Sequence, residues 1–377
     1  MRNGEIIARH YVTGQPVRVG IGNGLITSVE SAGTSSVPNN LWIAPGILDL
    51  QVNGYAGVDF QADELAPEDL LHAARQFRAD GGARFLLTLI TDEWASLTNR
   101  LRQLVQLRSQ SSELQIAIAG WHLEGPFLST ELGYHGAHDA TLQIDPTADH
   151  IREVRSITGN DPLLLTLAPE RPGSMDAIAL AVSLGIKVSL GHTNASAECL
   201  RRAVEAGAVG FTHLGNACPQ NWDRGDNIVW RMLDMPGPAV SLIPDGIHVS
   251  PALFRLLHRA IVPDRICYVT DAIAAAGAPP GQYSFGRLRV EVEADQVVRQ
   301  PGKPNLAGSA LRPGEGVFRA AEMLRCGWRD VWDRCSVNPA WLMGLNHGLQ
   351  AGNPACLCLI RERNDQPPEI VNLPGTA

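Results

Sequence analysis

The sequence predicts an α/β fold, in which a (β/α)8 TIM barrel carries a small β-sandwich domain built from the N- and C-terminal segments. Two observations lead to this prediction. After Pro45-Gly46, eight short apolar runs alternate with longer segments of helical periodicity, which is typical of repeated βα units. Before this point the apolar runs are short and are separated by Gly-rich turns, as in a β-domain.

The N-terminal segment, residues 1–44, is expected to form part of the small β-domain. Its strands are predicted at Glu5 to Val12, Pro16 to Ile21 and Leu25 to Glu30, with a tight turn at 22–24.

The barrel is predicted to span residues 45–348. Its strands are expected at Ile47 to Val52, Ala83 to Thr91, Ile116 to Leu123, Leu163 to Leu167, Lys187 to Leu190, Val209 to Thr212, Ala239 to Ile243 and Arg265 to Thr270. Helices between them are expected at Pro67 to Arg78, Ser96 to Arg108, Met175 to Leu184 and Ser196 to Glu205, whereas 216–238 is less regular and suggests a functional loop. Eight strands in one βα series favour a closed barrel over an open doubly wound sheet.

Two later segments are also expected to be strands. Gly286 to Val298 alternates polar and apolar residues like a hairpin, and Leu357 to Ile360 is a short apolar run. We expect both to pair with the N-terminal strands, so that residues 349–377 return to the small domain. Residues 364–377 are expected to be loosely ordered.

The composition indicates a soluble globular protein without a basic binding surface. Hydrophobic residues make up 45% of the 377 residues, and the net charge is 31 − 39 = −8, so neither nucleic acid nor a membrane is an expected partner. No secretory signal is visible, and no apolar stretch approaches the ~18 residues of a membrane span. The seven cysteines are scattered and include no Cys-x-x-Cys pair, which favours a cytoplasmic location.

Polar side chains follow the predicted barrel strands, where TIM-barrel enzymes place their catalytic residues. Glu124, His192 and His213 end the third, fifth and sixth strands. One carboxylate and two imidazoles form a suitable site for a catalytic divalent ion with a position open for water. A single histidine at a strand end is usually structural, but three such residues at matching positions favour a metal centre.

Asp271 ends the eighth strand and could act as a general base, although a metal ligand or a structural cap is also possible there. Two cationic side chains could bind an anion. His248 follows the seventh strand, and Arg224 lies in the long loop, where a solvated surface arginine is the alternative.

These residues lie in motifs that resemble the N-acetylglucosamine-6-phosphate deacetylases of the metal-dependent amidohydrolase superfamily. The resemblance covers most of the chain, from residue 45 to residue 339. The blocks that carry it are His122-Leu123-Glu124-Gly125-Pro126-Phe127, Gly136-Ala137-His138, Ala168-Pro169-Glu170, Gly191-His192-Thr193-Asn194-Ala195, His213-Leu214-Gly215-Asn216-Ala217, Asp245-Gly246-Ile247-His248, Thr270-Asp271-Ala272 and Leu306-Ala307-Gly308-Ser309-Ala310.

The resemblance implies a role for each matching residue. Glu124, His192 and His213 would bind one divalent cation per subunit, with zinc or iron favoured, and Asp271 and His138 would be catalytic. The residues implied to contact the substrate are Ala137, His138, Asn216, Ala217, Arg224, His248, Leu306, Ala307 and Gly308. The implied reaction is hydrolysis of the acetamide of an amino-sugar phosphate by a homodimer.

Two departures from the family pattern leave alternatives open. Most superfamily members have His-x-His at the end of the first strand, whereas this chain has Gln51 and Asn53, and amides are poor ligands for zinc or iron. Asp223 and Asp226 flank Arg224 and would weaken the binding of a phosphate there. Deacetylation of another N-acyl amino sugar, with or without a phosphate, is therefore an alternative, and a non-catalytic scaffold is a second one.

Overall fold

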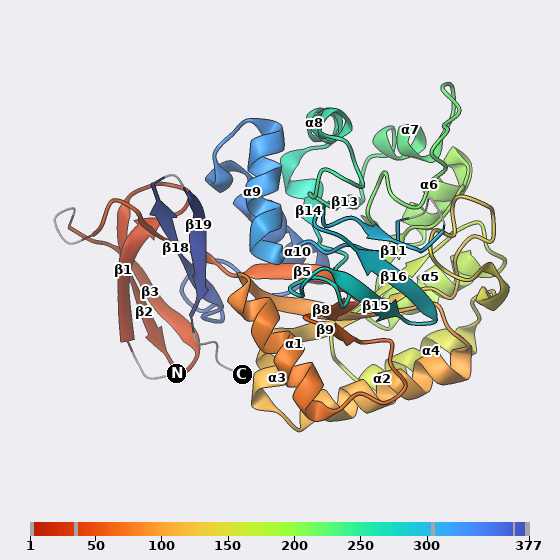
Figure 1. Cartoon of the computed structure of the whole chain (residues 1–377), viewed down its shortest axis with the longest axis horizontal. Coiled ribbons are helices and arrows are strands. Elements are labelled where there is room, and N and C mark those ends of the chain that lie inside the picture. Colours follow the sequence, from red (N-terminus) through yellow and green to blue (C-terminus); the bar gives the residue numbers. More distant parts are fainter. Residues whose placement is uncertain (1–3, 34–36, 303–305, 365, 374–377) are drawn as a thin grey trace.

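The computed structural model describes residues 4–33, 37–302, 306–364 and 366–373, and a barrel of eight parallel strands lies at its centre (Figure 1). The strands follow one another around the barrel in chain order: β5 (Ile47–Val52), β8 (Gly82–Ile90), β9 (Ile118–Glu124), β10 (Leu163–Leu167), β11 (Lys187–Leu190), β12 (Gly210–Phe211), β13 (Ala239–Leu242) and β14 (Ile266–Tyr268). Each overlaps a predicted run, so the prediction of the barrel is confirmed.

The first and last strands meet just beyond the end of β14. Val52 and Ala272 form a parallel bridge, and the Asn53 amide donates to the Ala272 carbonyl over 2.7 Å. This contact brings the ends of β5 and β14 together on the side where the other strands also end.

Helices cover the outside of the barrel (Figure 1). They are α1 (Pro67–Ala79), α2 (Trp94–Ser109), α3 (Ser112–Ala117), α4 (Ala148–Thr158), α5 (Ser174–Ser183), α6 (Ala197–Glu205), α7 (Ile228–Leu233), α8 (Pro251–Ala260), α9 (Pro313–Leu324) and α10 (Val337–Met343), with the 3-10 helices η2 (Ala140–Leu142), η3 (Pro263–Arg265) and η4 (Trp328–Cys335). On α1 the buried residues Leu70, Ala73, Ala74 and Phe77 follow the spacing of one helical face. The four predicted helices are confirmed, and the irregular 216–238 segment contains only α7.

A six-stranded sheet stands beside the barrel and joins both ends of the chain. Its strand order is β19 (Gln366–Asn372), β18 (Leu357–Arg363), β4 (Leu41–Pro45), β1 (Gly4–His10), β2 (Pro16–Gly22) and β3 (Leu25–Ser31). The predicted pairing of 357–360 with the N-terminal part is confirmed, because β18 pairs with β4. The prediction that residues 364–377 are loosely ordered is wrong for 366–372, which form β19 and pair with β18. Residues 374–377 lie outside the described residues.

The predicted hairpin forms, but the expected partner is wrong. Strands β15 (Gly281–Phe285), β16 (Leu288–Val292) and β17 (Val298–Arg299) make a separate three-stranded sheet. Its apolar residues, including Phe285 and Val290, pack with Ile90 and Ile273 at the ends of barrel strands. The remaining strands, β6 (Gly54–Tyr55) and β7 (Val58–Asp59), pair with each other.

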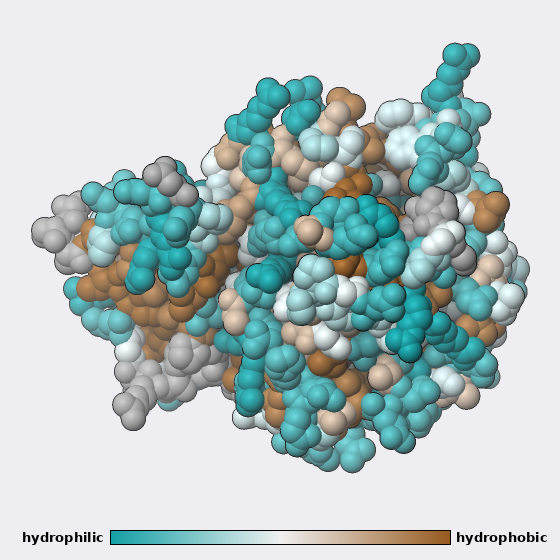
Figure 2. All heavy atoms as spheres, viewed as in Figure 1, coloured by the Kyte–Doolittle hydropathy of each residue, from teal (hydrophilic) through white to brown (hydrophobic). Residues whose placement is uncertain are grey.

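Apolar side chains gather over the small sheet, whereas polar residues cover most of the barrel face that Figure 2 shows. No helix among the described residues is both long and apolar enough to cross a membrane.

Candidate functional site

Three side chains from neighbouring strands converge at the mouth of the barrel. Glu124 is the last residue of β9, and His192 and His213 follow β11 and β12 by two residues. All three are buried, and one potential ligand atom of each lies within 4.8 Å of the others. The Nε2 atoms of His192 and His213 lie 3.3 and 2.8 Å from the same oxygen, Oε1 of Glu124. The three residues can therefore surround a single ion.

The surroundings of His192 fit a ligand role. His192 Nδ1 lies 3.0 Å from the carbonyl oxygen of Tyr134, which can only accept, so Nδ1 carries the hydrogen and Nε2 presents a lone pair to Glu124. Two acceptors that face each other require a cation or a proton between them. Burial raises the pKa of Glu124, but the three neighbouring histidines, His138 among them, outweigh burial and hold that pKa well below its usual range.

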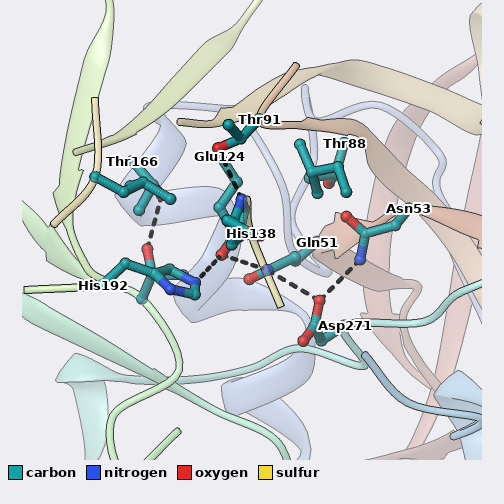
Figure 3. A network of polar contacts seen from close by, with 12 residues as sticks. Gln51, Asn53, Thr88, Thr91, Glu124, His138, Thr166, His192 and Asp271 are labelled. Atoms are coloured by element: carbon teal, nitrogen blue, oxygen red, sulfur yellow. Dashed lines mark hydrogen bonds and ion pairs between the residues drawn. The ribbon is translucent and has the colours of Figure 1, made fainter. Parts of the chain in front are cut away.

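Asp271 lies beside this centre and is linked to it by the side chains of the first barrel strand (Figure 3). Gln51 Nε2 donates to Glu124 Oε1 over 2.9 Å and to Asp271 Oδ1 over 3.0 Å, and Asn53 Nδ2 donates to the same Asp271 oxygen over 2.8 Å. Burial, followed by the charge of Glu124, raises the pKa of Asp271 to about 6. A carboxyl with such a pKa can both accept and return a proton near neutral pH.

His138 closes another side of the site. Its Nδ1 lies 2.8 Å from the Thr91 hydroxyl, and its Nε2 lies 3.6 Å from Glu124 Oε2. Gln143 donates to the same Thr91 oxygen, so the Thr91 hydroxyl is free to donate its hydrogen to His138 Nδ1. Burial, followed by the charge of His192, lowers the pKa of His138 to about 4. At neutral pH His138 is therefore uncharged, and its Nε2 carries a hydrogen that faces the site.

A cavity at the centre brings most of the predicted site residues together. Its lining consists of Glu124, Gly136, Ala137, His138, His192, His213, Asn216, Ala217, Asp271, Phe285, Leu306 and Gly308. Three predicted residues, Arg224, His248 and Ala307, do not line it. Ala307 is buried and lies between the lining residues Leu306 and Gly308 in the sequence, and Arg224 is exposed. His248 Nδ1 lies 2.6 Å from Asp245 Oδ2, and its Nε2 is buried without a hydrogen-bond partner among the described residues.

Several residues of this site are not among those that the sequence predicts. Gly136 lies in a matching block without a predicted role, and Phe285 precedes the predicted hairpin of 286–298 by one residue. The hydrogen bonds of Gln51 and Asn53 to Asp271 are also not predicted, although the position of both residues at the end of the first strand is a usable signal.

The backbone is strained where the strands deliver these side chains. His192, His213 and Asp271 have φ values of 50°, 32° and 51°, in the left-handed region that residues other than glycine rarely adopt. Each such residue costs on the order of 1–3 kcal/mol, and strain of this kind concentrates at functional sites. In this chain it turns the side chains into the barrel mouth directly after their strands end.

Comparison with known proteins identifies the family, although no family model matches the chain. A protein of Bos taurus named N-acetylglucosamine-6-phosphate deacetylase is 34% identical over 311 residues, which cover 80% of this chain and 75% of that protein. The chain belongs to the N-acetylglucosamine-6-phosphate deacetylase family. A family member from Vibrio furnissii is 30% identical over 332 residues and covers 87% of this chain and 81% of its own.

Solved structures of family members agree with this assignment. The deacetylase of Mycobacterium smegmatis, solved as an aspartate-to-alanine variant in complex with N-acetyl-D-glucosamine-6-phosphate, has a TM-score of 0.85 at 29% identity and covers 95% of this chain and 96% of its own. The deacetylase of Pasteurella multocida has a TM-score of 0.84 at 26% identity over 98% of this chain and 96% of its own. An enamidase of the amidohydrolase superfamily, at 15% identity and a TM-score of 0.55, shares the fold.

Proposed function

We propose that this protein hydrolyses the acetamide of N-acetylglucosamine-6-phosphate to glucosamine-6-phosphate and acetate. The observation that carries the proposal is the convergence of Glu124, His192 and His213 beside Asp271 in a buried cavity at the barrel mouth. Membership of the deacetylase family gives the substrate class.

Glu124, His192 and His213 would hold one divalent cation per subunit, and zinc or iron suits this donor set. The fit rests on the tautomer of His192, whose Nδ1 hydrogen is fixed on the Tyr134 carbonyl, and on the approach of both Nε2 atoms to one carboxylate oxygen. When bound, such an ion lowers the pKa of a water molecule and polarises an acetyl carbonyl.

The other residues move protons and stabilise charge. Asp271 takes a proton from the attacking water and returns it to the sugar nitrogen as the C–N bond breaks, which releases acetic acid and the neutral amine. The acetic acid then gives its remaining proton to the solvent and becomes acetate. Gln51 and Asn53 hold Asp271 in place during both transfers. The Nε2 hydrogen of His138 stabilises the negative charge that develops on the carbonyl oxygen.

We assign the 6-phosphate to Arg224 and His248. Support comes from the buried, unpartnered Nε2 of His248, and from Arg224, which makes no ion pair within the described part of the chain. Both side chains lie outside the lining of the catalytic cavity, as expected if the phosphate stays at a distance from the acetamide.

Steady-state release of acetate tests the proposal, with the metal content of the same sample measured first. N-acetylglucosamine-6-phosphate should be hydrolysed with a kcat/KM at least about a hundredfold above that of unphosphorylated N-acetylglucosamine. A ratio of this order is expected from two charge-assisted hydrogen bonds to the phosphate. Arg224→Gln should reduce this preference while leaving hydrolysis of the unphosphorylated sugar unchanged. A metal-loaded protein that releases no acetate from either sugar would refute the function.

We also propose a cytoplasmic homodimer. All seven cysteines are free, which suits a reducing compartment. Light scattering after size-exclusion chromatography would measure the mass, and a mass of one chain would contradict the dimer.

A further inference from the structure

A second cavity, of about 250 Å³, lies between the barrel and the small sheet. Its walls come from β3, α1, the start of β8, α3 and β18. The catalytic residues lie at the opposite ends of the barrel strands. Ile90, at the far end of β8, lies six positions after Arg84 in this cavity, which is roughly 20 Å along an extended chain. The cavity is therefore separate from the candidate active site.

Two guanidinium groups line this cavity, and neither has a carboxylate partner among the described residues. Arg84 donates through Nε to the Ile116 carbonyl over 3.1 Å, and Arg78 donates to the carbonyls of Ala83 and Leu373 over 2.7 and 3.3 Å. Within residues 4–33, 37–302, 306–364 and 366–373, neither arginine forms an ion pair, and neither terminal nitrogen of Arg84 has a hydrogen-bond partner.

Glu113, an acidic residue of α3, does not neutralise them. Glu113 on α3 feels the charge of Arg78, but both of its oxygens accept hydrogen bonds of 2.8 Å from Arg75. The Cys356 thiol in the same cavity is uncharged, because burial raises its pKa.

Positive charge withdrawn from water is costly unless an anion compensates it. Burial, with additional repulsion from Arg108 and Arg78, lowers the pKa of Arg84. A ligand that brought negative charge between the two guanidinium groups would remove this penalty. The two free terminal nitrogens of Arg84 match the geometry of a phosphate, which a guanidinium binds through two parallel hydrogen bonds.

We propose that this cavity binds a small phosphate monoester, with the phosphate between Arg78 and Arg84 and the organic part against Leu25, Ile116 and Leu357. Two cations call for a dianion, which a phosphate monoester supplies near neutral pH and a single carboxylate does not. The volume is close to that of pockets for small ligands. This site would regulate or stabilise the protein from outside the catalytic centre.

Calorimetric titration of the metal-loaded full chain with glucose-6-phosphate, which lacks the acetamide, tests the proposal. The wild-type protein should show two binding sites, one at the catalytic centre and one at the second cavity. Arg84→Gln should weaken the second site at least tenfold while kcat and KM for the acetylated substrate stay unchanged. The matched control is Arg152→Gln, which removes the same charge from an exposed arginine of α4 that pairs with Asp149 and should keep both sites.

A second variant covers the case in which Arg84→Gln does not fold. Leu25 is 46% exposed at the edge of the cavity, so Leu25→Glu should be tolerated and should place a competing carboxylate near the guanidinium groups. It should weaken the same site and spare the other. Identical titrations of the wild-type protein and the variants would overturn the proposal. A single wild-type site that Arg84→Gln leaves unchanged would also overturn it, whereas a single site that Arg84→Gln weakens would support it.

Discussion

Replacement of Asp271 by asparagine should separate activity from stability. The variant keeps the shape of the side chain, and its amide oxygen can still accept from Gln51 and Asn53. It loses the ability to take and return a proton. We expect kcat to fall by about 10²- to 10⁴-fold, the usual contribution of a general acid–base group, with the metal content unchanged.

The same variant should be at least as stable as the wild-type protein when the metal is removed. The ordinary pKa of an aspartate is 3.8, and burial and Glu124 raise that of Asp271 to about 6. This difference corresponds to about 3 kcal/mol that the ionised carboxylate costs the folded state at pH 7. Asparagine carries no such cost, so the free energy of unfolding should stay constant or rise by up to about 3 kcal/mol.

The sign of the pH dependence is fixed by the direction of the shift. Because the pKa of Asp271 is raised in the folded state, the folded protein binds this proton more tightly than the unfolded chain does. The resulting contribution to the free energy of unfolding is fully present below pH 3.8 and is lost as the pH rises through about 6. The stability difference between Asp271→Asn and wild type should therefore grow between these pH values and be constant above them.

Urea unfolding of chelated protein from pH 4 to 7 measures the stabilities, and acetate release by metal-loaded protein measures kcat. Asp295→Asn is the control, since Asp295 is an exposed carboxylate whose ion-pair partner within the described part of the chain is Arg299. A kcat close to that of the wild-type protein would refute the role of Asp271. A loss of several kcal/mol in the metal-free variant would refute the argument from burial.

Three further predictions follow from single contacts. Glu124→Gln should lower metal occupancy as measured by elemental analysis, because an amide is a poor ligand, and full occupancy would contradict ligation. A Cβ on Gly136, at φ +61°, would lie 3.0 Å from Cε1 of His192, so Gly136→Ala should reduce kcat/KM at least tenfold. The control is Gly57→Ala, whose added Cβ meets open space and should leave kcat/KM unchanged. Equal kcat/KM values for the two variants would refute the steric argument. Burial lowers the pKa of His347 from 6.5 to about 4, so the folded state should lose up to about 3 kcal/mol as the pH falls through this window. In urea titrations at pH 7 and pH 4.5, His347→Gln should show a smaller loss, and an equal loss would contradict the prediction.

The sequence predicts the barrel well because its strands are buried on both faces. β10 reads Leu-Leu-Leu-Thr-Leu and every residue in it is buried, so the apolar run and the strand coincide. The order of the strands then follows from the order of the runs, and the convergence of Glu124, His192 and His213 follows from the geometry of a parallel barrel.

The partners of edge strands are harder to predict. The alternating pattern of 286–298 predicts that one face of the hairpin is buried, but it does not indicate which surface covers that face. In the structure the apolar face packs on the barrel rim rather than on the small sheet. β19 has no buried residue and contains two prolines, and it becomes a strand only because β18 offers it an edge. Local sequence carries no signal for either choice.

The bridge made by Gln51 also bears on how many ions the proposed centre can hold. A second ion between Glu124 and Asp271 would need both carboxylates as ligands. The Gln51 amide already donates to an oxygen of each, over 2.9 and 3.0 Å, and so places a donor nitrogen where the ion would lie. An amide N–H group repels a cation and donates hydrogen bonds to the carboxylate oxygens. The Gln51 amide therefore occupies the position of a second ion and leaves neither carboxylate without a partner. The same hydrogen bonds hold the proposed base at a fixed distance from the proposed ligand, which explains how a site with one ion can keep its acid–base group in place.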